Sequence, residues 1–150
     1  MKFNLFTLLC ISFLLFSLGF KGENNGKSKV LHFNQIGWGD TIYAFIGGVI
    51  ISEEKGVQTP LVNVKVKLIS STSIVTDSAL TDSTGNYVLK GFKGIYRINF
   101  NKPSFQTLTV ENYESWPDMS STLNIELEKG VENQFYFLPD SMQFKGRFKQ

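Results

Sequence analysis

The sequence predicts an all-β protein in which seven short antiparallel strands form a sandwich of two sheets. Apolar and polar residues alternate one by one, as in residues 64–68, where three aliphatic side chains alternate with two lysines. Successive side chains of a strand point to opposite faces, so this alternation is typical of strands with one buried side. After the first 20 residues no stretch has the apolar spacing of a helix. Parallel sheets usually need helical crossovers, so the sequence favours antiparallel pairing.

The composition suits a β-rich core and excludes several functional classes. The 150 residues include 14 phenylalanines, and the formal net charge of +2 disfavours a strongly basic nucleic-acid binder. One cysteine, Cys10, and one histidine, His32, cannot supply a disulfide framework or a Cys/His zinc site. We therefore expect no catalytic residues, no cofactor and no bound metal.

Residues 1–19 are predicted to be a signal peptide. Lys2 gives a positive start, an apolar run follows, and the small residues Ser17 and Gly19 offer a cleavage site after Gly19. The protein would then be exported to the periplasm, the outer-membrane surface or the extracellular space, and Cys10 would be removed. The alternative is an uncleaved membrane anchor, because the apolar run nearly reaches the roughly 20 residues that cross a bilayer.

Three further regions follow the predicted signal. Residues 20–41 are rich in Gly, Asn and Lys and are predicted to be a linker, although residues 30–38 could add an edge strand. Residues 42–128 form the predicted sandwich. Residues 129–150 form a C-terminal extension, which is either an added hairpin or a tail. Strands are expected at residues 43–52, 62–70, 73–81, 86–90, 95–101, 105–111 and 121–128.

One turn carries a specific signal. Asp82 can accept hydrogen bonds from the backbone N–H groups that follow it, and Gly85 supplies the positive φ that closes the turn. Tyr87 then begins the return strand facing inward. We interpret these three residues as architectural.

An ordered series of motifs runs through the predicted sandwich. The motifs are Ile46-x-Gly48-x-Ile50, Pro60-Leu61-x-x-Val64-x-Val66-x-Leu68, Thr81-Asp82-x-x-Gly85-x-Tyr87, Gly94-x-Tyr96-x-Ile98 and Lys102-Pro103-x-Phe105. The series resembles the carboxypeptidase regulatory-like domain, which is related to the Cna-B type adhesin repeats. The resemblance implies a seven-stranded Greek-key sandwich of the transthyretin-like (prealbumin-like) type. Asn63 and Ser104 depart from the pattern, because the family usually has glycine at both positions.

The resemblance implies an accessory role. Domains of this family lie beside zinc carboxypeptidases, at the start of outer-membrane receptors and in secreted proteins, where they act as folding, docking or spacing units. We therefore predict a non-catalytic secreted or cell-envelope module with a structural, docking or protein-interaction role. Its expected partner is an envelope or surface protein.

Aromatic residues outside the predicted strands suggest an alternative function. Tyr113 and Trp116 belong to the loop between the last two predicted strands, where an aromatic group could stack on a sugar or anchor a partner. Phe144 and Arg147 belong to an alternating aromatic and basic segment that could also contact a partner. The alternative is a small carbohydrate- or peptide-binding protein that uses the Trp116 loop.

Overall fold

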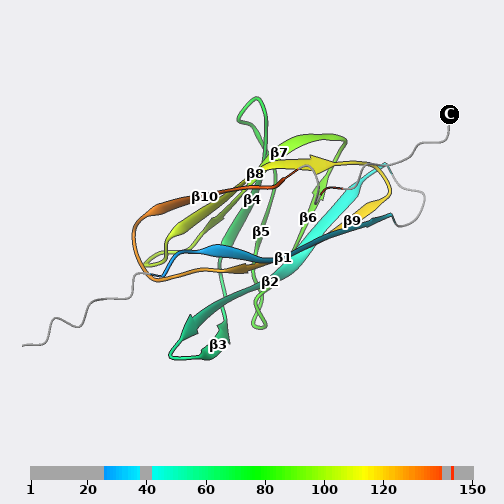
Figure 1. The fold of residues 1–150 in the computed structure, drawn as a ribbon. Coiled ribbons are helices and arrows are strands. Elements are labelled where there is room, and N and C mark those ends of the chain that lie inside the picture. The colour runs from blue at the N-terminus through cyan, green and yellow to red at the C-terminus, as the bar shows by residue number, and fades with distance from the viewer. Residues whose placement is uncertain (1–25, 38–41, 140–142, 144–150) are drawn as a thin grey trace, which may run out of the picture.

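The strands of the molecule gather in two sheets that face each other (Figure 1). The computed structural model describes residues 26–37, 42–139 and 143, and within these residues the chain is all-β. The strands are β1 (Lys29–Gly37), β2 (Ala44–Glu54), β3 (Val57–Pro60), β4 (Lys65–Ser70), β5 (Val75–Leu80), β6 (Asn86–Gly91), β7 (Gly94–Asn101), β8 (Thr107–Ser115), β9 (Met119–Glu126) and β10 (Asn133–Phe137).

Each sheet contains five of these strands. The first sheet has the order β1-β9-β2-β3, and β6 also pairs with β2. One edge of β2 is shared, because residues 44–49 pair with β6 and residues 51–54 pair with β3. The second sheet has the order β10-β8-β7-β4-β5.

Two features of the predicted topology are wrong. The seven predicted strands correspond to β2 and to β4 through β9, but the structure adds β1, β3 and β10. Pairing is not antiparallel throughout, because β9 runs parallel to β2 and β10 runs parallel to β8. The parallel pair of β8 and β10 needs no connecting helix. The chain leaves β8, crosses to the first sheet as β9 and returns to the second sheet as β10.

Residues 29–37, within the predicted linker, form the edge strand β1, which pairs antiparallel with β9. Val30 and Phe33 pack against the core, and a bulge separates Val30 from His32. One extra residue in a strand reverses which side chains face inward, so the bulge explains the weak alternation of this segment. The predicted signal peptide and linker residues 20–25 and 38–41 lie outside the described residues.

The described part of the C-terminal extension adds one strand to the second sheet. β10 pairs with β8, Tyr136 packs against the core, and Leu138 is buried. The next described residue, Gln143, accepts a hydrogen bond from the Glu114 backbone N–H (2.7 Å) and donates one to the Asn112 carbonyl (2.7 Å). As far as residue 139, the extension therefore forms a strand at the edge of the second sheet beside β8.

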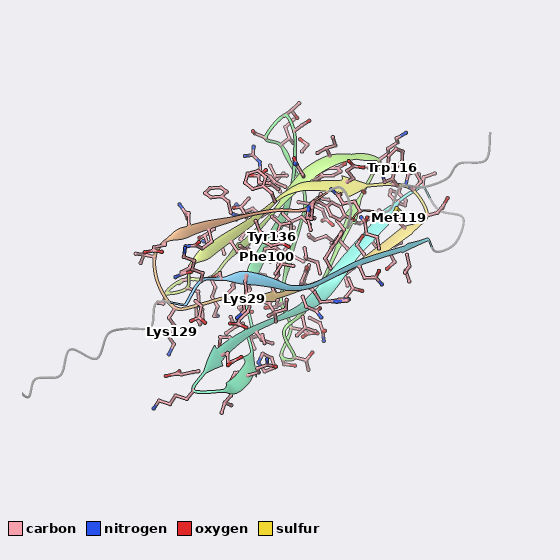
Figure 2. All side chains as sticks on the ribbon, in the orientation of Figure 1. Lys29, Phe100, Trp116, Met119, Lys129 and Tyr136 are labelled. Atoms are coloured by element: carbon pink, nitrogen blue, oxygen red, sulfur yellow. The ribbon has the colours of Figure 1, made fainter. Side chains whose placement is uncertain are left out.

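The hydrophobic core fills the space between the sheets. Phe100 is fully buried in it and Tyr136 packs against it from β10, whereas Trp116 and Lys129 lie toward opposite ends of the molecule (Figure 2). The Tyr87 and Phe100 rings meet edge to face, with their centroids 5.6 Å apart. Burying a side chain of this size stabilises the fold by about 1.5–3 kcal/mol.

The turn before β6 has a closed, hydrogen-bonded geometry. Gly85 takes φ +78°, and its carbonyl accepts a hydrogen bond from the Ile50 N–H (2.9 Å). Asp82 Oδ1 accepts hydrogen bonds from the Thr84 N–H (2.8 Å) and the Asn86 N–H (3.0 Å). Tyr87 is buried, and its hydroxyl donates to the Leu123 carbonyl (2.8 Å). The turn thus connects β2, β6 and β9.

The two positions that depart from the family pattern share one backbone conformation. Asn63 has φ 58° and Ser104 has φ 70°. Glycine adopts positive φ most readily, and asparagine tolerates it better than other residues. Ser104 therefore carries the more strained of the two bends.

Candidate binding site at the Trp116 end of the sandwich

A hollow of about 280 Å³ opens at the end of the second sheet where β7 begins and β8 ends. It is lined by Lys93, Gly94, Ile95, Glu114, Ser115 and Trp116. Its size is close to the lower limit for small-molecule sites in proteins, about 300 Å³. The hollow can therefore accept one large side chain or one small ring.

Backbone pairing brings the two walls of the hollow together. Gly94 lies opposite Ser115, and Ile95 lies opposite Glu114, in the antiparallel pair of β7 and β8. The Glu114 backbone is fixed further by two buried glutamines, because Gln35 donates to its carbonyl (3.0 Å) and Gln143 accepts from its N–H. A rigid backbone lowers the entropic cost of ordering the site when a ligand binds.

Trp116 is held between a carboxylate and an ammonium group. Its Nε1–H donates to Glu114 Oε2 (3.4 Å), and Lys93 Nζ lies 4.3 Å from the centroid of its indole ring. A cation over an aromatic ring is attracted by about 0.5–1 kcal/mol at an exposed site. These contacts fix the half-buried indole at the rim of the hollow.

Ser115 lines the hollow, but its hydroxyl lies beside Gly91, between the two sheets. The residue is 1% exposed, and its Oγ has no hydrogen-bond partner among the described residues. A buried hydroxyl without a partner costs about 1–3 kcal/mol. Because the hydroxyl faces Gly91 of the other sheet, this cost belongs to the packing between the sheets and not to the hollow.

A second aromatic group lies at the same end of the molecule. The Tyr43 and Phe92 rings are 5.0 Å apart, and Lys90 Nζ lies 3.4 Å above the Tyr43 ring. The register places them here, because Ala44 at the start of β2 lies opposite Gly91 at the end of β6. Phe92 is 58% exposed, and Ile95 in the hollow is 57% exposed. This end of the sandwich therefore presents aromatic and apolar side chains beside two lysines.

The structure separates the two aromatic residues predicted as contacts. Trp116 borders the hollow, but Tyr113 is fully buried and its hydroxyl is hydrogen-bonded to Ser121 Oγ (2.8 Å). Burial raises the pKa of Tyr113 to about 12. Tyr113 is therefore a core residue, and its prediction as a ligand contact is wrong. The other two predicted contacts, Phe144 and Arg147, lie outside the described residues.

Sequence reasoning missed most of the residues around Trp116. Lys93 and Ile95 are distant from Trp116 along the chain and join it only through the β7–β8 register. The exposed position of Ile95 also breaks the usual assignment of isoleucine to a core. Alternation with the buried Tyr96 and Ile98 places Ile95 on the outer face of β7, but it does not show that Trp116 lies beside it.

The predicted turn residues lie away from this site. Asp82 is exposed beside β3 and β6, and the hydrogen bond from the Thr84 hydroxyl, followed by those from the Asn86 and Thr84 backbone, lowers its pKa. All of these contacts are local. They agree with an architectural interpretation of the turn.

Other kinds of site are not found in the described part of the chain. Within residues 26–37, 42–139 and 143, no three His, Cys, Asp or Glu side chains are grouped so that they could hold a metal ion. The same residues contain no helix with the length and apolarity of a membrane span. Comparisons with models of known protein families and with curated proteins give no match.

Proposed function

We propose that this protein is a non-catalytic β-sandwich module of the cell envelope or the extracellular space, and that it docks a partner protein at its Trp116 end. One observation carries the docking role: Ile95, which lines the hollow that Trp116 borders, is 57% exposed, and Phe92 at the same end of the sandwich is 58% exposed. Export follows from the predicted signal peptide, and an accessory role follows from the family resemblance.

The arrangement at this end supports a protein partner. Protein interfaces concentrate binding energy in aromatic residues near the centre and place charged groups at the rim. Here Trp116 and Phe92 supply the aromatic groups, and Lys93 and Glu114 supply the charged ones. The hollow has room for one apolar side chain of the partner.

The charges at this end indicate an acidic partner surface. Lys90 and Lys93 lie over aromatic rings, while the Glu114 carboxylate accepts the hydrogen bond from Trp116. An ammonium group over a ring still attracts an anion on its solvent side. A partner that inserts an apolar side chain next to a carboxylate would match both features.

Quantitative co-purification tests this function. The purified protein is immobilised, incubated with envelope proteins of its own host, and the retained proteins are quantified by mass spectrometry. Trp116→Ala should reduce retention of the partner by about tenfold or more, as expected for an interface hot spot. Val131→Ala is the matched control, because Val131 is 95% exposed at the opposite end. Equal retention by both variants would contradict the proposal.

A second candidate function is carbohydrate or peptide binding at the same hollow. It is favoured by the indole of Trp116, which Glu114 and Lys93 hold at the rim of the hollow, since sugars stack on aromatic rings. A glycan array separates the two functions. Trp116-dependent binding of a defined glycan, without retention of a protein, would favour this second function.

A further inference from the structure

β10 forms one outer edge of the second sheet. It pairs with β8 on one side, and no strand of the described residues pairs with its other side. Figure 1 shows β10 running along the outside of the sheet. This edge shares no residue with the hollow at Trp116.

The register shows which backbone groups of β10 face outward. Thr107 N–H donates to the Glu132 carbonyl (3.0 Å), and Leu138 N–H donates to the Glu111 carbonyl (3.2 Å). In a parallel pair, alternate residues direct both their N–H and their C=O toward the neighbouring strand. Gln134 and Tyr136 therefore face β8 with their backbone groups. The backbone groups of residues 133, 135 and 137 face away from it.

Those outward-facing positions also carry exposed aromatic side chains. Phe135 is 63% exposed and Phe137 is 66% exposed, whereas Tyr136 between them packs against the core. They lie on the outer face of the sheet beside Thr109 and Glu111. Both the backbone and the side chains of this edge thus have surface that a further strand would cover.

The other outer strands carry features that discourage pairing. β1 contains a bulge and begins with Lys29, and β3 has four residues and ends at Pro60. β5 contains Asp77, whose carboxylate accepts a hydrogen bond from the Lys90 N–H (2.7 Å) of the other sheet. Charges, bulges, prolines and short length are the devices that protect sheet edges. β10, with the sequence NQFYF, has no charge, no proline and no register shift.

We propose that two copies of this chain associate by pairing their β10 strands in antiparallel orientation around Phe135. The outward backbone groups then form about six hydrogen bonds between the copies. Phe135 lies opposite Phe135 of the second copy, and Asn133 lies opposite Phe137. The two second sheets join into one continuous sheet, with the phenylalanine rings side by side on its outer face.

A second copy fits this edge because the strand is uncharged. Two-fold pairing places Phe135 of one copy opposite Phe135 of the other. A charged residue at position 135 would therefore face an identical charge. Glu132 precedes the strand. In this pairing it lies opposite Leu138 of the second copy, so the two Glu132 side chains do not face each other. A five-residue pairing buries less than the roughly 1,200 Å² of a standard interface, so the association is reversible and depends on concentration.

Sedimentation equilibrium of the exported protein, with all residues that follow its signal, tests the proposal. Over about 1–500 µM the average mass should rise from that of one chain toward that of two. Phe135→Glu and Phe135→Lys should each weaken the association by about tenfold or more, because like charges then face each other. A 1:1 mixture of the two variants should recover a dimer, since Glu then faces Lys. Val131→Glu, a change at another exposed position outside the strand, should leave the association unchanged.

Three results would overturn the proposal. The first is a single-chain mass at every concentration. The second is a dimer that neither Phe135 variant weakens, and the third is a mixture of the variants that stays monomeric. If the protein is monomeric but dimerises when residues 144–150 are removed, the C-terminal end of the same chain is the occupant of this edge. That result also overturns the proposal.

Discussion

Glycines at two positions allow close approach between backbones. A Cβ atom at Gly48 would overlap the carbonyl oxygen of Leu123, so the parallel pair of β2 and β9 requires glycine there. A Cβ atom at Gly85 would lie 2.6 Å from the Ile50 carbonyl oxygen, and the residue also has φ +78°. Contact distance and backbone conformation therefore both select glycine at position 85.

Gly85→Val should destabilise the protein more than Asp82→Ala. A β-branched residue at positive φ costs about 1–2 kcal/mol, and the collision with Ile50 adds to this. Asp82→Ala removes only local hydrogen bonds from an exposed side chain, so its effect should be smaller. Urea unfolding midpoints of the two variants measure the difference. The turn would have another geometry if Gly85→Val were neutral.

The buried tyrosines should make the fold sensitive to alkaline pH. Burial raises the pKa of Tyr113 to about 12 and also raises that of Tyr87. An unfolded tyrosine ionises near pH 10, so between these values the unfolded state releases protons that the folded state retains. The contribution of these tyrosines to the free energy of unfolding is therefore fully present below pH 10 and decreases above it. For Tyr113 the decrease is about 1–3 kcal/mol at pH 12. Unfolding midpoints from pH 8 to 11.5 test this, and Tyr113→Phe should show a shallower decline.

At the scale of elements, one ion pair fastens the edge strand β1. Lys29 Nζ lies 3.0 Å from Glu126 Oε1, and the Glu126 side chain is 4% exposed while that of Lys29 is 56% exposed. The hydrogen bond to Glu126 raises the pKa of Lys29. Nearby, burial and the Glu126 carboxylate raise the pKa of Glu128. The lysine therefore compensates negative charge in a partly buried place.

Lys29→Met should destabilise the protein by about 1–3 kcal/mol at pH 7, because the buried Glu126 carboxylate loses its partner. The folded pKa of Lys29 is raised, so this contribution is complete below pH 10.5 and disappears as the pH rises through the folded value. Urea unfolding of both proteins across this range measures it. Lys129→Met is the control, because Lys129 and Glu54 are both 69% exposed and their pair should contribute little. Equal losses in the two variants would contradict this role of Lys29.

Strand positions were predictable where one face of the strand is buried and the other is exposed to solvent. This holds for β4, where Val66 and Leu68 point inward and Lys65 is exposed. It fails for β10, since Phe135 and Phe137 are exposed apolar residues that hide the alternation. Pairing direction was not predictable either, because it depends on which sheet the chain enters after each turn.

β3 was missed for a different reason. Its hairpin turn is Lys55-Gly56, and both residues have positive φ, 54° and 79°. Two such residues form the tight turn that joins antiparallel strands, usually with Asn-Gly or Asp-Gly. Lysine is uncommon at this position of such a turn, so the sequence did not predict a hairpin here. All four β3 residues are exposed, which removes the alternation as well.

At the scale of the whole molecule, the two ends of the sandwich differ in character. The end with Trp116 carries the hollow and the exposed aromatic groups, and the opposite end carries Lys129 and the β2–β3 hairpin (Figure 2). The sequence pointed to Trp116 through its place in a loop. The hollow beside it could not be predicted, because its walls come from two strand ends whose register only the fold sets.

Site-specific photo-crosslinking in living cells of the protein's own host tests the docking role of the Trp116 end most directly. A photoreactive amino acid replaces Ile95, which lines the hollow and is 57% exposed, or Val131 at the opposite end as a control. We predict one discrete adduct of a single partner protein from position 95, with no such adduct from position 131. Trp116→Ala should remove that adduct while the protein stays folded. No adduct from position 95, or the same adducts from both positions, would contradict a docking role for this end of the sandwich.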